Sequence, residues 1–332
     1  MNLIPQKRCQ RLLVTGASGF IGRNLVIDLV SRGFGVRVLT RDMNRCGYST
    51  DIETCIGDLT DPESLSGIAE GIHGVVHCAG SLGRWNTDEA ELHEVNVQGS
   101  TNLLEQFSGK RLHRFVHLSA GGVTGPVGAV QADETYCCKP VTAYEKSKYA
   151  GEQEVLRVGK QLGLPIIVVR PTFVYGPGDD HKLGLYKSIA EGRFAFVGDG
   201  KSVNTPVYIS DLIQGICLAV EKGSCGQIYI IGGEKPVTKE DLVYAIADAL
   251  GVTRPRARIP RWIAWYASIG VELLGRRVGY EPILTRSRVM MMADDYAYSS
   301  RKAARDLGYR PTVTLTEGIH AAIKAYRKEG LL

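Results

Sequence analysis

The sequence predicts an α/β fold built on a doubly wound parallel sheet, and three observations indicate it. Short apolar segments alternate with helical patterns from the start of the chain, and a glycine-rich turn follows the first of them. The 332 residues, 44% of them hydrophobic, suffice for one large domain and a smaller second one. Short apolar strands separated by helices form a parallel sheet covered on both faces.

In the first half of the chain the predicted strands and helices alternate, as such a sheet requires. Each strand is a short apolar run, and each helix repeats apolar residues at the helical period. The strands are Arg11–Thr15, Val36–Thr40, Gly74–Cys78, Arg114–Ser119 and Ile166–Arg170, and the main helices are Phe20–Ser31, Glu89–Phe107 and Ala143–Leu162.

After Gly176 the pattern loosens, because Pro177 and Gly178 interrupt it. Two further strands and six helices are predicted, and the alternation indicates that the second part of the protein is interleaved with the first. The strands are Val207–Ile209 and Gln227–Ile231, and the helices are Leu185–Glu191, Asp211–Glu221, Thr238–Leu250, Pro260–Leu274, Ser300–Leu307 and Leu315–Lys328.

Composition and charge exclude several classes of protein. A net charge of +5 over this length is too weak to indicate nucleic-acid binding. The eight cysteines form no CxxC pair and do not alternate with histidine, so we expect reduced structural thiols, no metal site and a reducing cytoplasm. The first ten residues lack the apolar run of a signal peptide. The longest membrane-like stretch, Trp262–Leu274, is shorter than the ~20 residues that a spanning helix needs.

The glycine-rich turn TGASGFIG is typical of a dinucleotide site. Gly16, Gly19 and Gly22 come directly after the first strand and open the first helix. Such glycines permit a tight turn, let the backbone approach a pyrophosphate and allow close packing of helix and strand. The helix N-terminus then offers unpaired N–H groups to the phosphates. We expect the cofactor to contact these glycines together with Ser18, Phe20 and Ile21.

The end of the second strand distinguishes NAD from NADP. A carboxylate there would bind the ribose 2′-hydroxyl of NAD and repel the 2′-phosphate of NADP. The chain has Thr40 at that position, followed by Arg41, whose guanidinium can bind a phosphate. NADP is therefore preferred over NAD, although Asp42 is close and Arg41 would also suit an ordinary solvated surface.

Two further strand ends are predicted to meet the cofactor. Asp58, followed by Leu59, comes after a short third strand and either bonds the adenine edge or caps a helix near Pro62. Ala79 and Gly80 end the next strand, where small residues let the chain pass beneath the cofactor.

Tyr144 and Lys148 are the predicted catalytic pair. Their spacing stacks them on one face of a helix. Ketone reduction needs a proton for the alkoxide, and a nearby ammonium is expected to lower the pKa of the phenol. Ser119 ends a strand 25 residues earlier, where its hydroxyl can orient the substrate oxygen, and Pro171 follows Arg170 at the next strand end.

Together these motifs resemble the extended short-chain dehydrogenase/reductases, also called the NAD-dependent epimerase/dehydratase family, over nearly the whole chain. TGASGFIG, IGDLTD, VHCAG, EVNVQGSTN, RFVHLSAGGVTG, YEKSK and VVRPTFVYGPGD follow one another in the family order. The resemblance implies a Ser119–Tyr144–Lys148 triad, a role for Asn96 in positioning Lys148 through ordered water, and a homodimer formed by the two long helices. It also implies a Rossmann-type NAD(P)-binding domain at 1–176, to which 207–232 return, with 177–206 and 233–332 forming the substrate-binding part.

Residues that depart from the family motifs indicate which branch of the family the chain resembles most. Dehydratases usually have Thr-Asp-Glu where this chain has Ser119-Ala120-Gly121, so dehydration is not expected. Phe173 and Asn204 stand where many nucleotide-sugar enzymes carry an Asn and an Arg that bind the diphosphate. The pattern is closest to the 3β-hydroxysteroid dehydrogenase and dihydroflavonol reductase-like branch, which the GRW at Gly83–Trp85 also resembles. A large apolar pocket, or alternatively ordinary core, would use Trp85, Trp262, Trp265, Tyr266 and Val289–Met292.

The sequence thus predicts an NADP-dependent enzyme that interconverts a ketone and a secondary alcohol on a fairly large apolar substrate. Two alternatives stay open: a nucleotide-sugar epimerase or 4-ketoreductase, and a non-catalytic NADP-sensing protein. Arginines flank Pro260–Leu274, which suits either an ordinary lid helix or a peripheral contact with a membrane surface.

Overall fold

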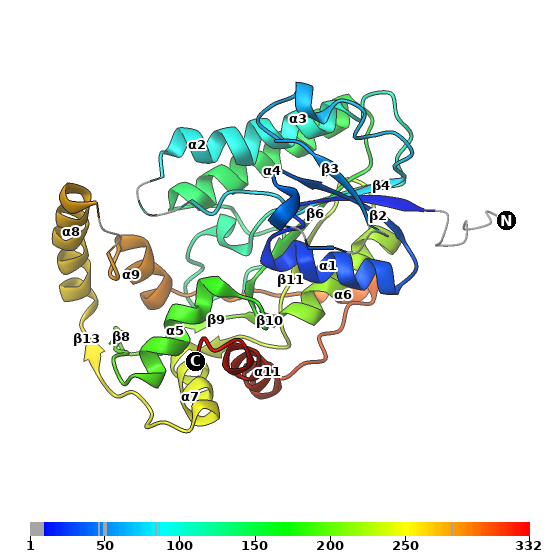
Figure 1. Ribbon diagram of the computed structural model, residues 1–332. Coiled ribbons are helices and arrows are strands. Elements are labelled where there is room, and N and C mark those ends of the chain that lie inside the picture. Colours follow the sequence, from blue (N-terminus) through cyan, green and yellow to red (C-terminus); the bar gives the residue numbers. More distant parts are fainter. Residues whose placement is uncertain (1–9, 46, 49–51, 84, 86, 280–281) are drawn as a thin grey trace.

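The computed structural model describes residues 10–45, 47–48, 52–83, 85, 87–279 and 282–332. Its centre is a sheet of seven parallel strands, which confirms the predicted α/β class (Figure 1). The order across the sheet is β11 (Ile228–Ile231), β6 (Ile166–Pro171), β5 (Arg114–Leu118), β4 (Gly74–His77), β1 (Arg11–Thr15), β2 (Gly35–Thr40) and β3 (Glu53–Ile56).

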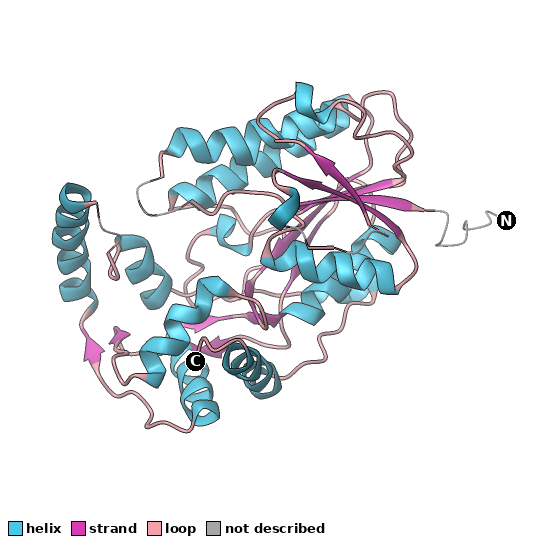
Figure 2. Ribbon diagram, viewed as in Figure 1, coloured by secondary structure: helices cyan, strands magenta, loops and turns pink. Residues whose placement is uncertain are grey.

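Helices cover both faces of this sheet, as Figure 2 shows. The strands are apolar on both sides because each face packs on a separate hydrophobic core. One core joins β-strand residues such as Val14 to α1 (Phe20–Ser31), α6 (Ile209–Lys222) and α10 (Arg301–Leu307). The other joins residues such as Leu13 to α3 (Gly99–Glu105) and α4 (Ala143–Gln161). Neighbouring residues of one strand therefore serve opposite layers.

The prediction of one continuous helix over Glu89–Phe107 was wrong. The segment consists of α2 (Glu89–His93), a π turn (Glu94–Gln98) and α3. The π turn carries Asn96, whose carbonyl oxygen lies so close to α4 that a Cβ on Gly151 would overlap it. Such widened turns are frequent at functional sites, because they redirect one side chain without ending the helix.

A smaller part lies beyond the carboxyl ends of the strands, around a third core of aromatic and aliphatic side chains. Its main helices are α5 (Asp180–Ala190), α7 (Lys239–Leu250) and α11 (Leu315–Lys328). Three two-stranded sheets join it together: β7 (Phe173–Tyr175) with β10 (Pro206–Tyr208), β9 (Val203–Asn204) with β12 (Val237–Thr238), and β8 (Phe196–Val197) with β13 (Arg258–Ile259).

Several helix limits in this part differ from the predicted ones. Helix α5 begins before Leu185, because the Asp179 side chain accepts a hydrogen bond from the His181 N–H and caps the helix. Helix α8 (Arg261–Val278) runs past Leu274 to a left-handed Gly279. Helix α9 (Arg286–Ala293) was not predicted as a helix. No helix in the described part of the chain is long and apolar enough to cross a membrane.

Candidate active site

Six neighbouring strands bring the predicted site residues to one edge of the sheet. Each of these residues follows the carboxyl end of its strand, where open α/β sheets bind ligands. The strand order reverses between β1 and β4, which places the glycine turn at the switch point. The residues that follow β3, β2, β1, β4, β5 and β6 are Asp58, Arg41, Gly16, Ala79, Ser119 and, at the end of β6 itself, Pro171.

The glycine turn is held in a conformation that larger residues would not tolerate. Gly16 has φ +68°, and a Cβ there would lie 2.7 Å from the Ala79 backbone nitrogen. A Cβ on Gly22 would overlap the Gly16 carbonyl oxygen. The turn is therefore folded tightly against the end of β4, and α1 begins directly above it.

The N-terminus of α1 is suited to a bound anion. Its N-cap is Gly19, no side chain caps it, and its first turn carries no acidic residue. By contrast, α4 starts with a full capping box, in which Thr142 and Glu145 bond each other's backbone N–H groups. A pyrophosphate next to Phe20 and Ile21 would supply the negative charge that the α1 N-terminus lacks. The residues present thus fit a dinucleotide.

At the far edge of this site, Arg41 has a solvated side chain, which makes one long ion pair with the described residues. Its side chain is 72% exposed, and its Nη1 lies 3.8 Å from Asp58 Oδ2. The other Asp58 oxygen, Oδ1, accepts hydrogen bonds from the Thr60 N–H and hydroxyl. The Thr40 hydroxyl donates a hydrogen bond within its own turn, to the Asp42 carbonyl oxygen. Asp58 therefore stabilises its own turn and leaves the Arg41 guanidinium largely available.

Lys148 is buried beneath this edge and fixed to the sheet. Its side-chain nitrogen donates to the Leu118 carbonyl oxygen at 2.6 Å. Leu118 is the residue before Ser119, so this bond joins α4 to the strand end that carries the hydroxyl. Lys148 also lies beneath Gly80, where a Cβ would be 3.5 Å from the lysine nitrogen. Tyr144 stands one helical turn before Lys148 on the same helix.

The expected lowering of the Tyr144 pKa is not what the protein alone produces. Burial raises the pKa of Tyr144 to about 12, and the negative charge of Glu145 adds to the rise. Burial also lowers the pKa of Lys148 to about 8. The Lys148 ammonium donates to the Leu118 carbonyl oxygen, and no lowering of the Tyr144 pKa by this lysine offsets the effect of burial. Tyr144 is consequently a fully protonated phenol at neutral pH.

Ser119 has a hydroxyl that needs a partner. Its Oγ is buried and makes no hydrogen bond to any described residue, while its backbone N–H donates to the Val169 carbonyl at 2.8 Å. A buried hydroxyl without a partner costs about 1–3 kcal/mol. A carbonyl or hydroxyl oxygen placed beside Ser119 would remove that cost, so this position suits a polar group of a ligand.

Asn96 holds the loop after β4 against α4. Its Oδ1 accepts from the Ser81 N–H at 2.8 Å, and its Nδ2 donates to the Ser81 carbonyl and to the Ser147 hydroxyl at 2.9 Å each. Ser147 in turn donates to the Tyr144 carbonyl at 2.8 Å. Sequence reasoning missed Ser81 and Ser147. Ser147 could have been found from the sequence because it is next to Lys148. Ser81 could not, because its contacts with Asn96 are made by its backbone and leave no signal in the residue type.

His77 is a second residue that the sequence did not reveal. Its Nδ1 lies 2.7 Å from Thr15 Oγ1 and its Nε2 lies 2.9 Å from Ser100 Oγ. Since the Ser100 hydroxyl donates to the Asn96 carbonyl, the proton between Ser100 and His77 belongs to Nε2. Thr15 then donates to Nδ1 and accepts from the Ala79 N–H. This series of hydrogen bonds joins β1, β4 and the π turn beneath the candidate site.

Arg170 does not point at a ligand. Its guanidinium makes two hydrogen bonds to the Glu152 carboxylate, at 2.9 and 2.5 Å, and both side chains are buried. Glu152 lies one turn beyond Lys148 on α4, so the ion pair fixes this helix to β6. The resulting role of Arg170 is to hold α4 in place.

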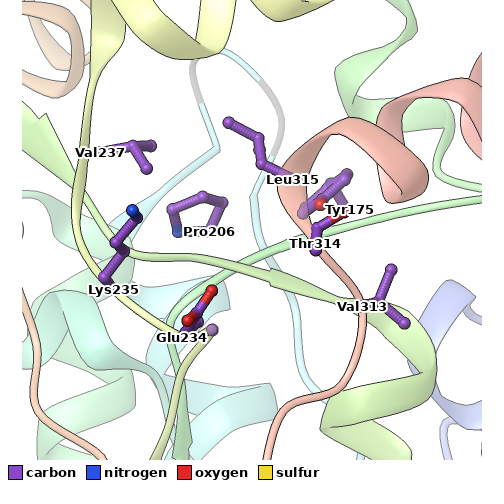
Figure 3. Close-up of a pocket in the computed structure, with 9 residues that line it drawn as sticks. Tyr175, Pro206, Glu234, Lys235, Val237, Val313, Thr314 and Leu315 are labelled. Atoms are coloured by element: carbon purple, nitrogen blue, oxygen red, sulfur yellow. The ribbon is translucent and has the colours of Figure 1, made fainter.

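Two of the residues predicted to line an apolar pocket or to form ordinary core lie at the surface. Trp262 and Tyr266 are on the exposed face of α8 and are not core residues. Trp265, Val289 and Met292 pack together in a small core instead. In the predicted GRW loop, Arg84 lies outside the described residues. A separate cavity of about 50 Å³, too small for a steroid-sized molecule, lies against β7 and β10 (Figure 3). It is lined by Tyr175, Pro206, Gly233, Glu234, Lys235, Val237, Val313, Thr314 and Leu315.

Comparison with known proteins agrees with this arrangement. The sequence profile described as "NAD dependent epimerase/dehydratase family" matches residues 12–232. The 4-hydroxy-2-methyl-3-oxo-4-farnesyl-3,4-dihydroquinoline-1-oxide ketoreductase of Stigmatella aurantiaca is 30% identical over 95% of this chain and 96% of its own. The 3 beta-hydroxysteroid dehydrogenase/Delta 5-->4-isomerase of Mycobacterium tuberculosis is 30% identical over 95% and 90%. The crystal structure of gox2253 has a TM-score of 0.82 at 30% identity, over 97% of this chain and 99% of that chain.

Proposed function

The chain belongs to the NAD-dependent epimerase/dehydratase family and is an NAD(P)-dependent oxidoreductase, and we propose that it interconverts a large apolar ketone and its secondary alcohol with NADP. The observation that carries this proposal is the unpartnered, buried Ser119 hydroxyl next to the residue that binds Lys148. A substrate oxygen placed there would meet the Ser119 hydroxyl as a hydrogen-bond donor, and Tyr144, a protonated phenol on the same helix as Lys148, is the proposed proton donor to that oxygen.

The roles proposed for the three side chains follow from their protonation. A dinucleotide held at the glycine turn Gly16–Gly22 would supply the hydride for reduction of the substrate carbon, or accept it in oxidation. During reduction Tyr144 donates its proton to the substrate oxygen, and its raised pKa keeps that proton in place at neutral pH. Ser119 donates a hydrogen bond to the same oxygen and stabilises its developing charge. Lys148 supplies a positive charge close to both groups.

The apolar substrate class is supported by the absence of two polar residues that many nucleotide-sugar enzymes use to bind a diphosphate. Phe173 and Asn204 stand where nucleotide-sugar enzymes bind a diphosphate. Asn204 is buried and its Oδ1 accepts from the Thr205 N–H, so it is occupied within the protein. The ring of Phe173 is covered by the Lys182 ammonium at 4.6 Å. The names of the two relatives refer to a farnesylated quinoline oxide and to hydroxysteroids, which are both large and mostly apolar.

The preference for NADP is proposed from Thr40 and Arg41. No carboxylate ends β2, and the exposed Arg41 guanidinium has, among the described residues, a single 3.8 Å ion-pair contact, to Asp58. A 2′-phosphate would offer it two charge-assisted hydrogen bonds. Binding of NADPH and NADH is therefore compared in wild type, Arg41→Ala and Arg305→Ala, a matched exposed arginine elsewhere. We expect Arg41→Ala to weaken NADPH binding by about tenfold and NADH binding little. Equal wild-type affinities would contradict the preference.

The catalytic proposal is tested on steroid, farnesylated, β-keto lipid and sugar-nucleotide ketones with NADPH. We expect turnover of an apolar ketone, and a loss of about 10²–10⁴-fold in Tyr144→Phe. Tyr149→Phe, on the same helix, is the matched control and should keep its activity, and NADPH binding shows that both variants fold. Turnover of the sugar nucleotide alone, or bound NAD in the purified protein, would support the epimerase or 4-ketoreductase alternative instead. Unchanged turnover in Tyr144→Phe would remove the proposed proton donor.

A further inference from the structure

Helix α8 turns most of its large apolar side chains toward solvent, whereas Trp265 packs inward and the buried positions hold small and polar residues. Its buried residues are Ala264, Ser268, Glu272 and Gly275. Trp262 is 65% exposed and Tyr266 69%. A surface helix of a globular protein normally has the opposite arrangement, with its apolar stripe facing the core. The other large apolar residues that α8 exposes are Ile263, Val271, Leu273, Leu274 and Val278.

These side chains form one continuous face. Successive residues are ~100° apart around a helix, so the exposed large apolar residues of α8 fall within about half of its circumference. Within that half Arg277 is the only charged residue, and the inner half packs on Val289 and its neighbours in α9. Figure 1 shows α8 standing at the outer edge of the molecule, with α9 on its inner side and the central sheet far away. We call the outer half of α8 the apolar face.

The segment of the sequence that contains this face is rich in arginine, although Arg254, Arg258 and Arg261 pair with acids from outside it. Residues 254–288 contain eight arginines, two glutamates and no lysine or aspartate, a balance of +6 in a chain of net charge +5. The rest of the chain is therefore close to neutral. An asymmetry of this kind indicates a negatively charged partner for the segment.

The acidic groups nearby are already used in ion pairs. Glu272, the acid within α8, is buried and pairs with Arg286. Arg276 and Arg277 are exposed and pair with no acidic side chain of the described residues. They close the C-terminal end of the apolar face, where the helix dipole also favours cations. The other pairs are Arg254 with Asp248, Arg258 with Glu240, and Arg261 with Asp294.

We propose that the apolar face of α8 docks into the surface of an anionic lipid bilayer. Helices that lie in a membrane interface combine an exposed apolar face with arginines that bind lipid phosphates. Trp262 and Tyr266 suit the boundary between acyl chains and headgroups, because each has an apolar body and a polar tip. With 18 residues, α8 is about 27 Å long and would lie in the plane of the bilayer. The inference is independent of the proposed function, since binding is measured without turnover.

A second copy of this chain is a poorer occupant for the same face. A two-fold contact would bring into one interface the exposed Arg276 and Arg277 of both copies, which pair with no acidic side chain of the described residues. The lipid surface supplies both the apolar medium and the negative charge.

The test measures sedimentation of the full-length protein with phosphatidylglycerol vesicles and with phosphatidylcholine vesicles, at low and high salt. We expect wild type to bind the anionic vesicles at least about tenfold more tightly, with the preference lost at high salt. Leu273→Gln/Leu274→Gln and Arg276→Gln/Arg277→Gln should each reduce binding to the anionic vesicles by about tenfold. In the bound state Trp262 should shift the fluorescence emission to shorter wavelength.

Matched controls are Ile27→Gln/Val130→Gln, which changes exposed apolar residues elsewhere, and Arg193→Gln/Arg305→Gln, which changes exposed arginines elsewhere. These variants should bind like wild type, and circular dichroism verifies that all variants fold. The proposal fails if wild type does not bind the anionic vesicles, or if the α8 variants bind as well as wild type. It also fails if Leu273→Gln/Leu274→Gln lowers the solution mass, because the face would then be a contact between copies.

Discussion

At the scale of single residues, two buried histidines are held neutral beneath the site. Burial lowers the pKa of His77 to about 3 and that of His117 well below its usual range, and the nearby Lys148 charge acts in the same direction. His77 must keep Nδ1 as an acceptor for the Thr15 hydroxyl, so a proton there would break its hydrogen-bond chain. The ring of His117 lies 5.3 Å from that of His77 and has no hydrogen-bond partner among the described residues.

These histidines should make the protein less stable in acid. Above pH ~6.5 both are neutral in the folded and unfolded states and contribute nothing to pH dependence. Below that pH the two histidines are protonated in the unfolded chain but stay neutral in the folded protein. The free energy of unfolding therefore falls as pH falls, by up to about 1.4 kcal/mol per pH unit for each histidine. Urea unfolding between pH 7.5 and 5.5 (a range of ~2 units) measures this slope.

The matched variants are His117→Leu and His320→Gln, the second altering an exposed histidine on α11. His117→Leu should reduce the slope by about half, and His320→Gln should leave it unchanged. Equal slopes in all three proteins would show that the buried rings are not responsible.

Lys148 is expected to set the alkaline limit of ketone reduction. Its pKa of about 8 means that the ammonium is present below that pH and is lost as pH rises through it, whereas Tyr144 stays protonated until far higher pH. The value of kcat/KM for reduction should therefore be level near neutrality and fall above about pH 8. Lys148→Arg should move the fall to higher pH, and Lys146→Arg, which changes an exposed residue of the same helix, should not. A level profile in wild type up to pH ~10 would disprove this role.

At the scale of elements, α4 is fixed at its start by a capping box and near its middle by the Glu152–Arg170 ion pair. Removing one partner of a buried pair leaves an uncompensated charge, so Glu152→Leu and Arg170→Met should each lower the free energy of unfolding by about 3–5 kcal/mol. The double variant should lose much less than the two together. Urea unfolding of the four proteins measures the coupling. Arg157→Met, which breaks the exposed pair with Glu154, is the control and should cost at most about 1 kcal/mol.

The same scale shows where sequence patterns were sufficient for the fold. The limits of β1, α1 and α11 agree with the prediction, because apolar periodicity and capping residues are local properties. The π turn before α3 was missed because nothing local requires it. The π turn depends on the close approach of α4 at Gly151, which is about 50 residues away in the chain. Such a contact is set by tertiary packing and leaves no local pattern.

At the scale of the whole molecule, the chain passes between its two parts more than once. After β6 it enters the smaller part at β7, returns to the sheet at β11 and leaves again. Near the C-terminus Tyr298 bridges to Ala132, and Tyr296 to Asn204. Parts joined by several crossings are expected to unfold together.

A single calorimetric transition should therefore be seen, and NADPH should shift it as a whole. At about 100 times its Kd the cofactor adds about 2.7 kcal/mol to the free energy of unfolding. For a chain of 332 residues that corresponds to a rise of about 4 °C in Tm. AMP at the same concentration is the control and should shift the transition less. Two transitions, of which NADPH moves only one, would show that the parts unfold independently.

The sequence by itself determined the strand and helix segments of the sheet, the family resemblance and the strand ends that carry the candidate site, because apolar periodicity and glycine turns are local patterns. It also placed Tyr144, Lys148 and Ser119 at neighbouring elements. Only the tertiary structure decided their electrostatics, because burial raises the pKa of Tyr144 and lowers that of Lys148. It likewise decided that Trp262 and Tyr266 of α8 face solvent, since the side that a helix buries depends on what packs against it and not on its own composition.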